Sequence, residues 1–359
     1  MTSDFEVTVS YSETSEDDSE SLSAVIPLSL QRSSISPFSN LHSFINAIKI
    51  LRNDHFDLIH SVTIKPNLFF GILARLYSIP ILITIPGMGT TFSSHGLKFK
   101  LLRKLIIFLY RFAGKNDKCF FIFENKQNKM HFLKENICSP ENSTVVSGAG
   151  INLKKFIYTE ETSPGSHPVK LLFAARLLKG KGLEDLIEAA ALVNTNEIRV
   201  DLYVAGITDT DSKETIPLAQ IKGWHTDGRI NYLGLIDDMP ELLSNCHIIA
   251  LPTKYGEGLP RILLEANACG RPVITTDIAG CNDFVEDRIN GLLVNPGSVV
   301  ELSEAIEKLL DPIIRKAMGL AGRQKVEKSY SREHVIDQYR VVYKKILQQY
   351  DGKKSKEVI

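Results

Sequence analysis

The stretch "YGEGLPRILLEANACGRPVITTD", from Tyr255 to Asp277, decides the fold. The apolar runs "HIIALP" (247–252) and "PVITTD" (272–277) lie on either side of an amphipathic segment at 260–269. Short apolar runs suit buried strands, and the segment between them suits a helix that begins near Pro260. This strand–helix–strand order predicts a parallel sheet that is covered by helices on both faces.

The same alternation continues in both directions along the chain. In the first half we predict strands at 5–10, 56–61, 80–85, 118–123 and within 143–150, and helices at 43–53, 65–77, 97–114 and 125–136. In the second half we predict strands at 169–175, 199–206, 229–234, 247–252, 272–277 and 291–295, and helices near 183–193, 238–245, 260–269, 299–310 and 331–349.

A polar stretch, "TEETSPGSHP" (159–168), separates the two halves and is typical of a linker. We therefore expect two Rossmann-like domains, 1–158 and 159–330, that face each other across a cleft. Residues 331–359 are expected to supply a terminal helix that returns toward the first domain.

The bulk composition excludes several classes of protein. Lysine plus arginine equals aspartate plus glutamate at 42 each, which gives no support for nucleic-acid binding. The five cysteines show no C-x-x-C spacing, so we expect neither a zinc site nor a disulfide framework. We expect the protein to reside in a reducing compartment. No apolar run approaches the ~20 residues of a membrane-spanning helix. We expect a soluble, cytoplasmic protein.

The loops that follow strands are the places to look for a ligand site, because ligands of such sheets bind at the carboxyl ends of the strands. Glu257 follows the strand at 247–252, and the amides near Gly258 precede a helix, where a phosphate is readily bound. Glu265 lies one to two turns into that helix and can flank the same pocket. Taken alone, two acids at this spacing favour a plainer interpretation, in which Glu265 pairs on a solvated face.

A second such loop is "AARLLKGKGLEDLIEA" (174–189), after the first strand of the second half. Arg176 and Lys181 stand on either side of a glycine-containing turn that leads into a helix. Two fixed cations beside helix N-terminal amides suit a diphosphate and would stabilise it as a leaving group. The alternative is that both are surface residues of a basic loop.

These motifs together resemble the family 4 retaining glycosyltransferases of the GT-B fold. The resemblance is carried by "ARLLKGKG", "GEGLPRILLEANACGRPVI" and "GLLVNPGSVVELSEAI" (291–306), and it covers nearly the whole chain. "FDLIHSVTIKPNLFFGILARLYSIPILITIPGMGTTFSS" (56–94) resembles a narrower branch, which adds N-acetylhexosamines or related sugars to polyprenyl-diphosphate-linked glycans.

The resemblance implies a role for each matched residue. Arg176 and Lys181 would hold the diphosphate of a UDP-sugar donor, and Glu257 would hold hydroxyls of the donor sugar. The remaining donor contacts would come from the amides at Gly258 and Leu259, from Glu265 at the ribose and from Leu235 near the base. On the donor and acceptor side of the first domain we expect Gly87, Gly89, His60 and Lys65. For His60, a lone histidine that ends a predicted strand, a structural role is favoured over contact with the acceptor.

The family pattern also implies a strand, a glycine-rich turn and a helix before "FEVTVS" (5–10), and the chain as given does not contain them. The N-terminal domain is therefore expected to lack its first strand and helix. A non-catalytic, transferase-like binding protein stays open as an alternative for that reason. A sugar-nucleotide epimerase stays open as a second alternative, because that class shares the GT-B fold. We expect no cofactor and no metal, and we assign no role to the acidic triplet "DTD" (209–211).

The segment "LKFKLLRKLIIFLYRFAGKNDK" (97–118) carries seven basic residues against one acid, Asp117. Leu101, Leu105, Phe108, Leu109 and Phe112 recur in it at helical spacing. Such a helix can lie on an anionic membrane surface, which would put the protein peripherally on the inner face of the cytoplasmic membrane. Alternatively, the apolar side chains pack on the sheet and the lysines face water.

Overall fold

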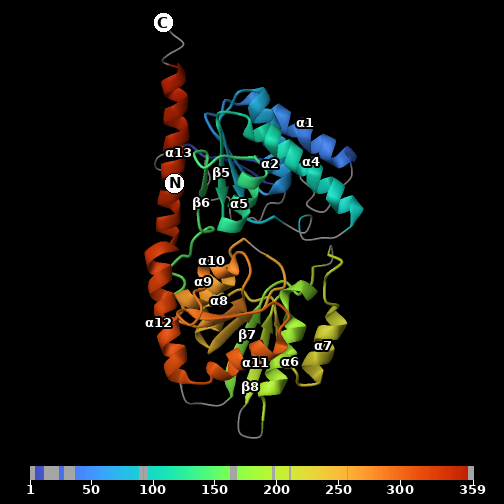
Figure 1. The fold of residues 1–359 in the computed structure, drawn as a ribbon, viewed down its shortest axis with the longest axis vertical. Helices are drawn as coiled ribbons and strands as arrows, with labels where there is room; N and C mark the ends of the chain where they lie inside the picture. The colour runs from blue at the N-terminus through green and yellow to red at the C-terminus, as the bar shows by residue number, and fades with distance from the viewer. Residues whose placement is uncertain are drawn as a thin grey trace.

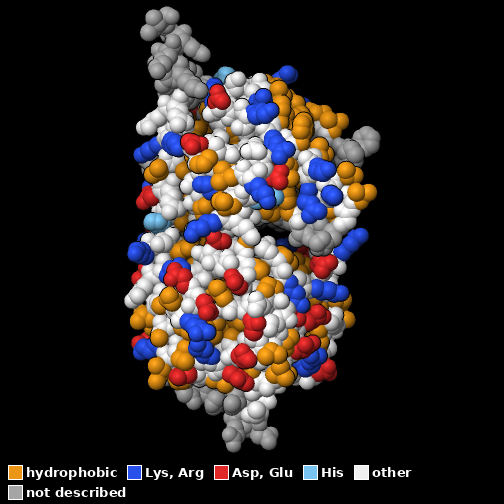
Figure 2. Space-filling view, viewed as in Figure 1, with side chains coloured by type: hydrophobic (Ala, Val, Ile, Leu, Met, Phe, Trp, Pro, Cys, Tyr) orange, Lys and Arg blue, Asp and Glu red, His pale blue; other side chains and the backbone are white. Residues whose placement is uncertain are grey.

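The computed structural model describes residues 5–11, 24–27, 37–88, 92, 96–161, 168–195, 199–209, 212–256 and 258–354. Figure 1 shows two α/β lobes, one above the other, and Figure 2 shows that the surface is hollowed between them. Each lobe contains parallel strands with helices against them, so the α/β class predicted from the sequence is confirmed.

The first lobe is built on a four-stranded parallel sheet with the order β3-β4-β5-β6. Its strands are β3 (Ile59–Val62), β4 (Ile81–Ile85), β5 (Cys119–Phe123) and β6 (Ser143–Val145). Its helices are α1 (Pro37–Asn53), α2 (Ile64–Leu76), α4 (Leu97–Gly114) and α5 (Lys126–Lys134). The strands β1 (Thr8–Tyr11) and β2 (Ala24–Pro27) pair in a separate two-stranded sheet. In the described part of the chain, β3 is therefore an end strand of the larger sheet.

The second lobe is built on a six-stranded sheet with the order β12-β11-β10-β7-β8-β9, and every pairing in it is parallel. Its strands are β7 (Val169–Ala174), β8 (Val200–Ala205), β9 (Asn231–Gly234), β10 (Ile248–Leu251), β11 (Val273–Thr276) and β12 (Gly291–Val294). Its helices are α6 (Leu183–Val193), α7 (Leu218–Thr226), α8 (Met239–Ser244), α9 (Arg261–Ala268), α10 (Cys281–Phe284) and α11 (Val299–Lys308), with a short 3₁₀ turn at Lys179–Lys181.

The strand order of the second lobe fixes where a ligand can bind. The chain starts at the central strand β7, moves outward to β8 and β9, and then returns to β10 on the other side of β7. The direction of winding therefore reverses between β7 and β10. In doubly wound sheets the crevice outside this reversal point is where ligands bind. The loops that follow β7 and β10 are thus the best-placed loops of this lobe.

Two long helices end the chain and connect the lobes. In Figure 1, α12 (Pro312–Ser329) lies beside the second lobe and α13 (Arg332–Lys354) beside the first. Val335, Val342 and Ile346 of α13 pack against the buried side chains of Leu82 and Phe120 in the sheet of the first lobe. The other face of that sheet packs against α1, α2 and α4. The returning helix thus covers the face that the other helices leave open.

The sequence did not predict α12. Its start is nevertheless marked in the sequence: Asp311 is the N-cap and accepts a hydrogen bond from the amide of Ile313 at 2.8 Å, and Pro312 follows in the first turn. The helix carries seven charged or glutamine residues among its 18, so the apolar spacing used to predict the other helices is weak here.

Candidate functional site

The loop after β7 and the loop after β10 are in close contact at the point where the winding of the second sheet reverses. The amide of Lys254 donates to the carbonyl oxygen of Gly180 at 2.8 Å. A Cβ atom at Gly180 would overlap the Tyr255 ring, and one at Gly182 would overlap the Pro252 carbonyl oxygen. Only glycine lets the two backbones come this close, and Gly182 also has a φ of 79° that other residues rarely adopt.

Lys181 is brought to the second of these loops. Its side chain is buried, and its Nζ lies 5.2 Å from the centre of the Tyr255 ring, two residues before Glu257. The structure thus places the predicted cation and the predicted acidic loop at one end of the sheet. Glu257 itself lies outside the described residues, so its side chain is not placed.

Arg176 is more than half exposed at the same end of the sheet. Its guanidinium forms an ion pair of 2.8 Å with Asp209, which follows β8. Asp209 begins the "DTD" triplet, which the sequence analysis left without a role, and the other two residues of that triplet lie outside the described part of the chain. Asp209 therefore pairs with Arg176, the cation that the sequence analysis expected to bind the donor diphosphate.

The start of α9 is the point at which the first lobe reaches the second. The Glu124 carboxylate, directly after β5, accepts a hydrogen bond of 3.2 Å from the amide of Leu259. A Cβ atom at Gly258 would overlap both this carboxylate and the carbonyl oxygen of Pro86, which follows β4. Burial raises the pKa of Glu124 to about 7, and the hydrogen bond from Leu259 lowers it by less.

Glu265 pairs on its own helix. Its carboxylate lies 3.3 Å from Arg261, one turn earlier, and its side chain is largely buried. Burial raises the pKa of Glu265, and Arg261 opposes that shift. The plainer interpretation from the sequence, that Glu265 pairs on a solvated face, is therefore right about the pairing and wrong about the solvated face. Leu235 follows β9 at the same edge of the sheet and is 69% exposed, so it offers an open apolar surface.

His60, which was expected on the acceptor side, lies within β3 and contacts both β4 and α13. The His60 ring nitrogens lie 2.7 Å from the Tyr343 hydroxyl of α13 and 2.8 Å from the Thr84 hydroxyl of β4. Desolvation lowers the pKa of His60 to about 4, although part of the residue is exposed. His60 thus has the structural role that its isolated position in the sequence favours, because it joins the returning helix to the sheet.

The other acceptor-side predictions are placed only in part. Lys65 stands in the first turn of α2, just after β3, and desolvation lowers its pKa. Gly87 follows Pro86 and so adjoins the contact with Gly258. Gly89 lies outside the described residues. Glu124 was missed, although the rule used for the other loops, a polar residue directly after a buried strand, applies to it equally.

A metal ion has no evident seat in the described residues. They contain no group of three or more histidine, cysteine, aspartate or glutamate side chains that could hold one. The sequence-based expectation of a metal-free site stays a prediction, because Glu257 and Asp211 lie outside the described residues.

Comparison with known protein families covers both lobes. The family described as "Glycosyl transferases group 1" matches residues 168–312, and the family described as "Glycosyl transferase 4-like" matches residues 1–121. The first match contains the loops after β7 and β10, and the second contains most of the first lobe.

Two curated relatives cover most of this chain. A Campylobacter jejuni enzyme, N,N'-diacetylbacillosaminyl-diphospho-undecaprenol alpha-1,3-N-acetylgalactosaminyltransferase, is 32% identical over 304 residues, which are 80% of this chain and 76% of the enzyme. An Escherichia coli enzyme, UDP-Gal:alpha-D-GlcNAc-diphosphoundecaprenol alpha-1,3-galactosyltransferase, is 23% identical over 86% of this chain and 80% of the enzyme.

Solved structures agree on the fold. HepE from Anabaena in complex with UDP superposes with a TM-score of 0.73 at 18% identity, over 90% of this chain and 86% of HepE. Sucrose-phosphate synthase from Thermosynechococcus elongatus superposes with a TM-score of 0.79 at 20% identity, over 97% of this chain and 90% of that chain. With the family matches and the Campylobacter relative, they show that this chain belongs to the family 4 glycosyltransferases of the GT-B fold.

Proposed function

We propose that this chain is a retaining glycosyltransferase that moves a sugar, an N-acetylhexosamine, from a UDP-sugar to a lipid-linked saccharide acceptor. The observation that carries the proposal is the junction of the loops after β7 and β10. There, Lys181 lies against Tyr255, and the amides at the start of α9 are close to the same end of the sheet. Fixed cations and helix N-terminal amides stabilise the negative charge that grows on a departing nucleoside diphosphate.

Each site residue then has a proposed task. Arg176 and Lys181 hold the diphosphate, Glu265 binds the ribose, and Leu235 supports the base. Glu257 binds hydroxyls of the donor sugar. Two cations and several amides can neutralise the leaving diphosphate, so we propose that transfer needs no metal. In the retaining route the acceptor attacks the face from which the diphosphate leaves, and the diphosphate takes the proton of the attacking hydroxyl.

The choice of donor and acceptor follows the relatives. The Campylobacter relative is named for transfer of N-acetylgalactosamine to a diphospho-undecaprenol-linked sugar, and the Escherichia coli relative is named for a UDP-galactose donor and a diphosphoundecaprenol-linked acceptor. We therefore propose a UDP-N-acetylhexosamine donor and an acceptor on a polyprenyl diphosphate, as used in the assembly of a surface polysaccharide.

A membrane-bound acceptor requires a way to reach the membrane, and we propose that α4 supplies it. Four apolar residues of α4, spaced three or four apart, are each at least half exposed: Leu97, Leu101, Leu105 and Phe108. The helix packs on the sheet through a different face, formed by Ile106, Tyr110 and Ala113. The alternative from the sequence, in which the whole apolar stripe packs on the sheet, is therefore wrong for three residues of that stripe, Leu101, Leu105 and Phe108.

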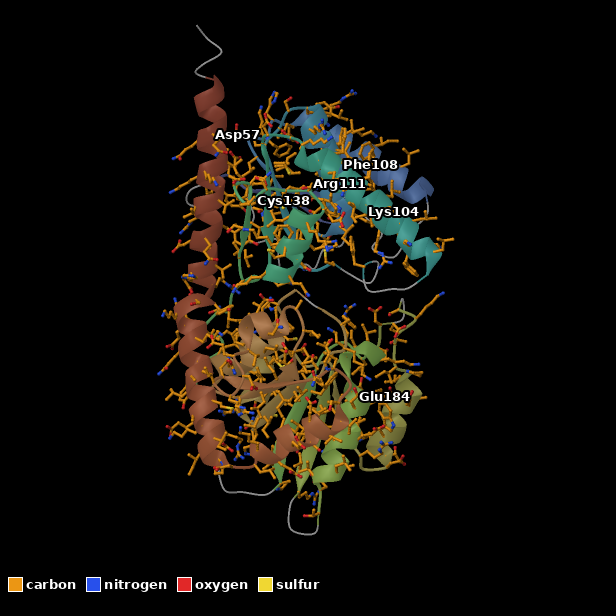
Figure 3. The ribbon with its side chains drawn as sticks, viewed as in Figure 1. Asp57, Lys104, Phe108, Arg111, Cys138 and Glu184 are labelled. Carbon is orange, nitrogen blue, oxygen red and sulfur yellow. The ribbon has the colours of Figure 1, made fainter. Side chains whose placement is uncertain are left out.

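The exposed stripe of α4 is surrounded by basic side chains. Lys98, Lys100 and Lys104 are exposed along it, and in Figure 3 Lys104 and Phe108 lie along α4 at the outer side of the first lobe. Leu41 and Ile45 of the neighbouring helix α1 are also exposed, and Figure 2 shows hydrophobic side chains over this edge of the lobe. Apolar residues with lysines around them suit an anionic leaflet. None of the helices that the structure describes is both long and apolar enough to cross a membrane.

The test of the proposed reaction is a screen of UDP-sugars against an undecaprenyl-diphosphate-linked saccharide, with the linkage and anomeric configuration of the product determined. We expect turnover in the presence of EDTA with a UDP-N-acetylhexosamine, and loss of turnover in Glu257→Ala. Turnover that is unchanged in Glu257→Ala would remove the assignment of that residue, and an inverted product would remove the retaining mechanism.

The membrane contact is tested by flotation with vesicles. We expect binding to vesicles that contain anionic lipid, weaker binding at high salt, and little binding to purely zwitterionic vesicles. The double variant Lys100→Glu/Lys104→Glu should lose this binding, while the control Lys222→Glu/Lys308→Glu, at exposed lysines of the second lobe, should keep it. Equal binding by both variants would contradict the role of α4.

A further inference from the structure

Glu124 of the first lobe forms a hydrogen bond with the loop of the second lobe that is proposed to bind the donor. It follows β5 at the carboxyl end of the first sheet, and its Oε2 lies 3.2 Å from the amide nitrogen of Leu259. That amide is one of the donors at the start of α9. On the other side of Gly258 lies the carbonyl oxygen of Pro86, so the backbone of 258–259 is enclosed by the first lobe.

Burial makes the charged form of the Glu124 carboxylate less favourable at this position. Burial raises its pKa to about 7, and the hydrogen bond from the Leu259 amide is the contribution that opposes this shift. Burial raises the pKa of the Tyr339 phenol on α13, and the charge of the nearby Glu124 carboxylate adds to that shift. A buried carboxylate that accepts from a backbone amide just before a helix makes the kind of contact that a phosphate or a sugar hydroxyl makes at such a site.

A second acid engages another group of the proposed diphosphate seat. Asp209 pairs with Arg176 at 2.8 Å, so both a cation and an amide of the seat are engaged by carboxylates of this chain. The two acids come from different lobes. A donor diphosphate that approaches the seat therefore meets negative charge as well as the groups that would bind it.

We propose that Glu124 competes with the donor: it accepts a hydrogen bond from the Leu259 amide and gives up that amide when the nucleotide-sugar binds. The proposal rests on the function proposed above, because the donor is the anion that replaces the carboxylate. Glu124 belongs to the first lobe, so its release removes one of that lobe's contacts with the start of α9. Donor binding is in this way coupled to movement of the lobes.

The coupling has a reciprocal contact that the donor does not displace. Asp283 of α10 accepts a hydrogen bond of 3.1 Å from the amide of Lys126, the first residue of α5, and one of 3.0 Å from the amide of Gly280. Each lobe thus presents a carboxylate to a helix N-terminus of the other. Only the contact of Glu124 involves α9, so Asp283 offers a matched control for a general loosening of the two lobes.

The experiment compares the affinity of UDP for the full chain and its variants by calorimetry at pH 8, where the carboxylate is charged. Glutamine at position 124 keeps the shape and an acceptor oxygen but removes the charge. We expect Glu124→Gln to bind UDP about tenfold more tightly, because a hydrogen bond to a charged group is typically worth about this factor. Glu124→Ala should change affinity in the same direction, and Asp283→Asn should change it less than about twofold.

The outcomes separate this inference from the proposed function. If the wild-type chain binds no UDP, the proposed donor is wrong and the competition falls with it. If the wild-type chain binds UDP and Glu124→Gln and Glu124→Ala bind it equally or more weakly, only the competition is wrong, since Glu124 is then a neutral cap or a direct donor contact. Equal tightening in Glu124→Gln and Asp283→Asn would also overturn it, because loosening of the lobes would then be the cause.

Discussion

The substitution Gly258→Ala tests whether the reaction needs the close contact between the two lobes at this position. A Cβ atom there would lie 2.0 Å from the carbonyl oxygen of Pro86, whereas Cβ atoms essentially never come within 3.0 Å of a neighbour. The backbone of 258–259 and the Pro86 carbonyl must therefore move apart by at least 1.0 Å in Gly258→Ala. The Leu259 amide is already 3.2 Å from Glu124, so a shift of that size breaks this hydrogen bond.

The displaced segment carries the amides proposed to meet the donor, so we expect a loss in kcat/KM for sugar transfer. A misplacement of about 1 Å can cost on the order of 100-fold in rate. The free energy of unfolding should change little, because the clash lies between the lobes and each lobe keeps its own core. The assay is transfer to a polyprenyl-diphosphate-linked acceptor, with thermal unfolding of each variant as the check on folding.

The control is Gly256→Ala, two residues earlier in the same loop. The nearest atom to a Cβ there is the Ala279 Cβ at 3.5 Å, an ordinary van der Waals distance. This variant should keep activity within about threefold of the wild-type chain. The reasoning is refuted if Gly258→Ala is as active as Gly256→Ala, because the close approach of Pro86 to the start of α9 would then have no part in the reaction.

Three further predictions concern charged side chains. Glu161→Gln removes the carboxylate paired with the buried Arg315, so the free energy of unfolding in urea should fall by about 3–5 kcal/mol, and a loss below about 1 kcal/mol would contradict this. The pKa of His60 is about 4 in the folded chain and 6.5 in the unfolded chain, so its contribution to stability is present above pH 6.5 and is lost as the pH falls toward 4. His60→Gln should therefore reduce the fall in melting temperature between pH 6.5 and pH 4. Parallel curves of melting temperature against pH for the variant and the wild-type chain would count against it. Lys181→Met should weaken UDP binding at least tenfold in calorimetry, with Lys179→Met as the control from the same turn, and equal effects would contradict the assignment.

The layout of the second lobe was predictable because each of its strands is a short apolar run with a turn on either side. The helix predicted near 183–193 is α6, Leu183–Val193, and it begins directly after Gly182, whose positive φ ends the preceding turn. The helix α12 was not predictable by the same means, since its polar residues interrupt the apolar spacing. Its start signal, Asp311 followed by Pro312, is local and would have been sufficient.

The exposed face of α4 could not be predicted from the sequence for a different reason. Its apolar residues recur at helical spacing, but spacing alone does not say which of them face the sheet. Ile106 and Tyr110 are buried, whereas Leu101, Leu105 and Phe108 are not. The basic residues between them are the local feature that favours an exposed face, because lysine is unfavourable against a buried sheet.

The loops of the candidate site were predictable and their partners were not, for a reason that lies in the topology. A rule about parallel sheets points to residues that directly follow strands, so it finds Arg176 after β7 and the loop after β10 without any knowledge of contacts. The acids that engage this site follow strands too, Asp209 after β8 and Glu124 after β5, but nothing local distinguishes them from other polar loop residues. Glu124 meets Leu259 across 135 positions, from one lobe to the other, and this contact depends on how the lobes sit. A residue supplied across a cleft therefore leaves no spacing in the sequence, and in a two-lobed transferase these are the residues through which ligand binding and lobe movement can be linked.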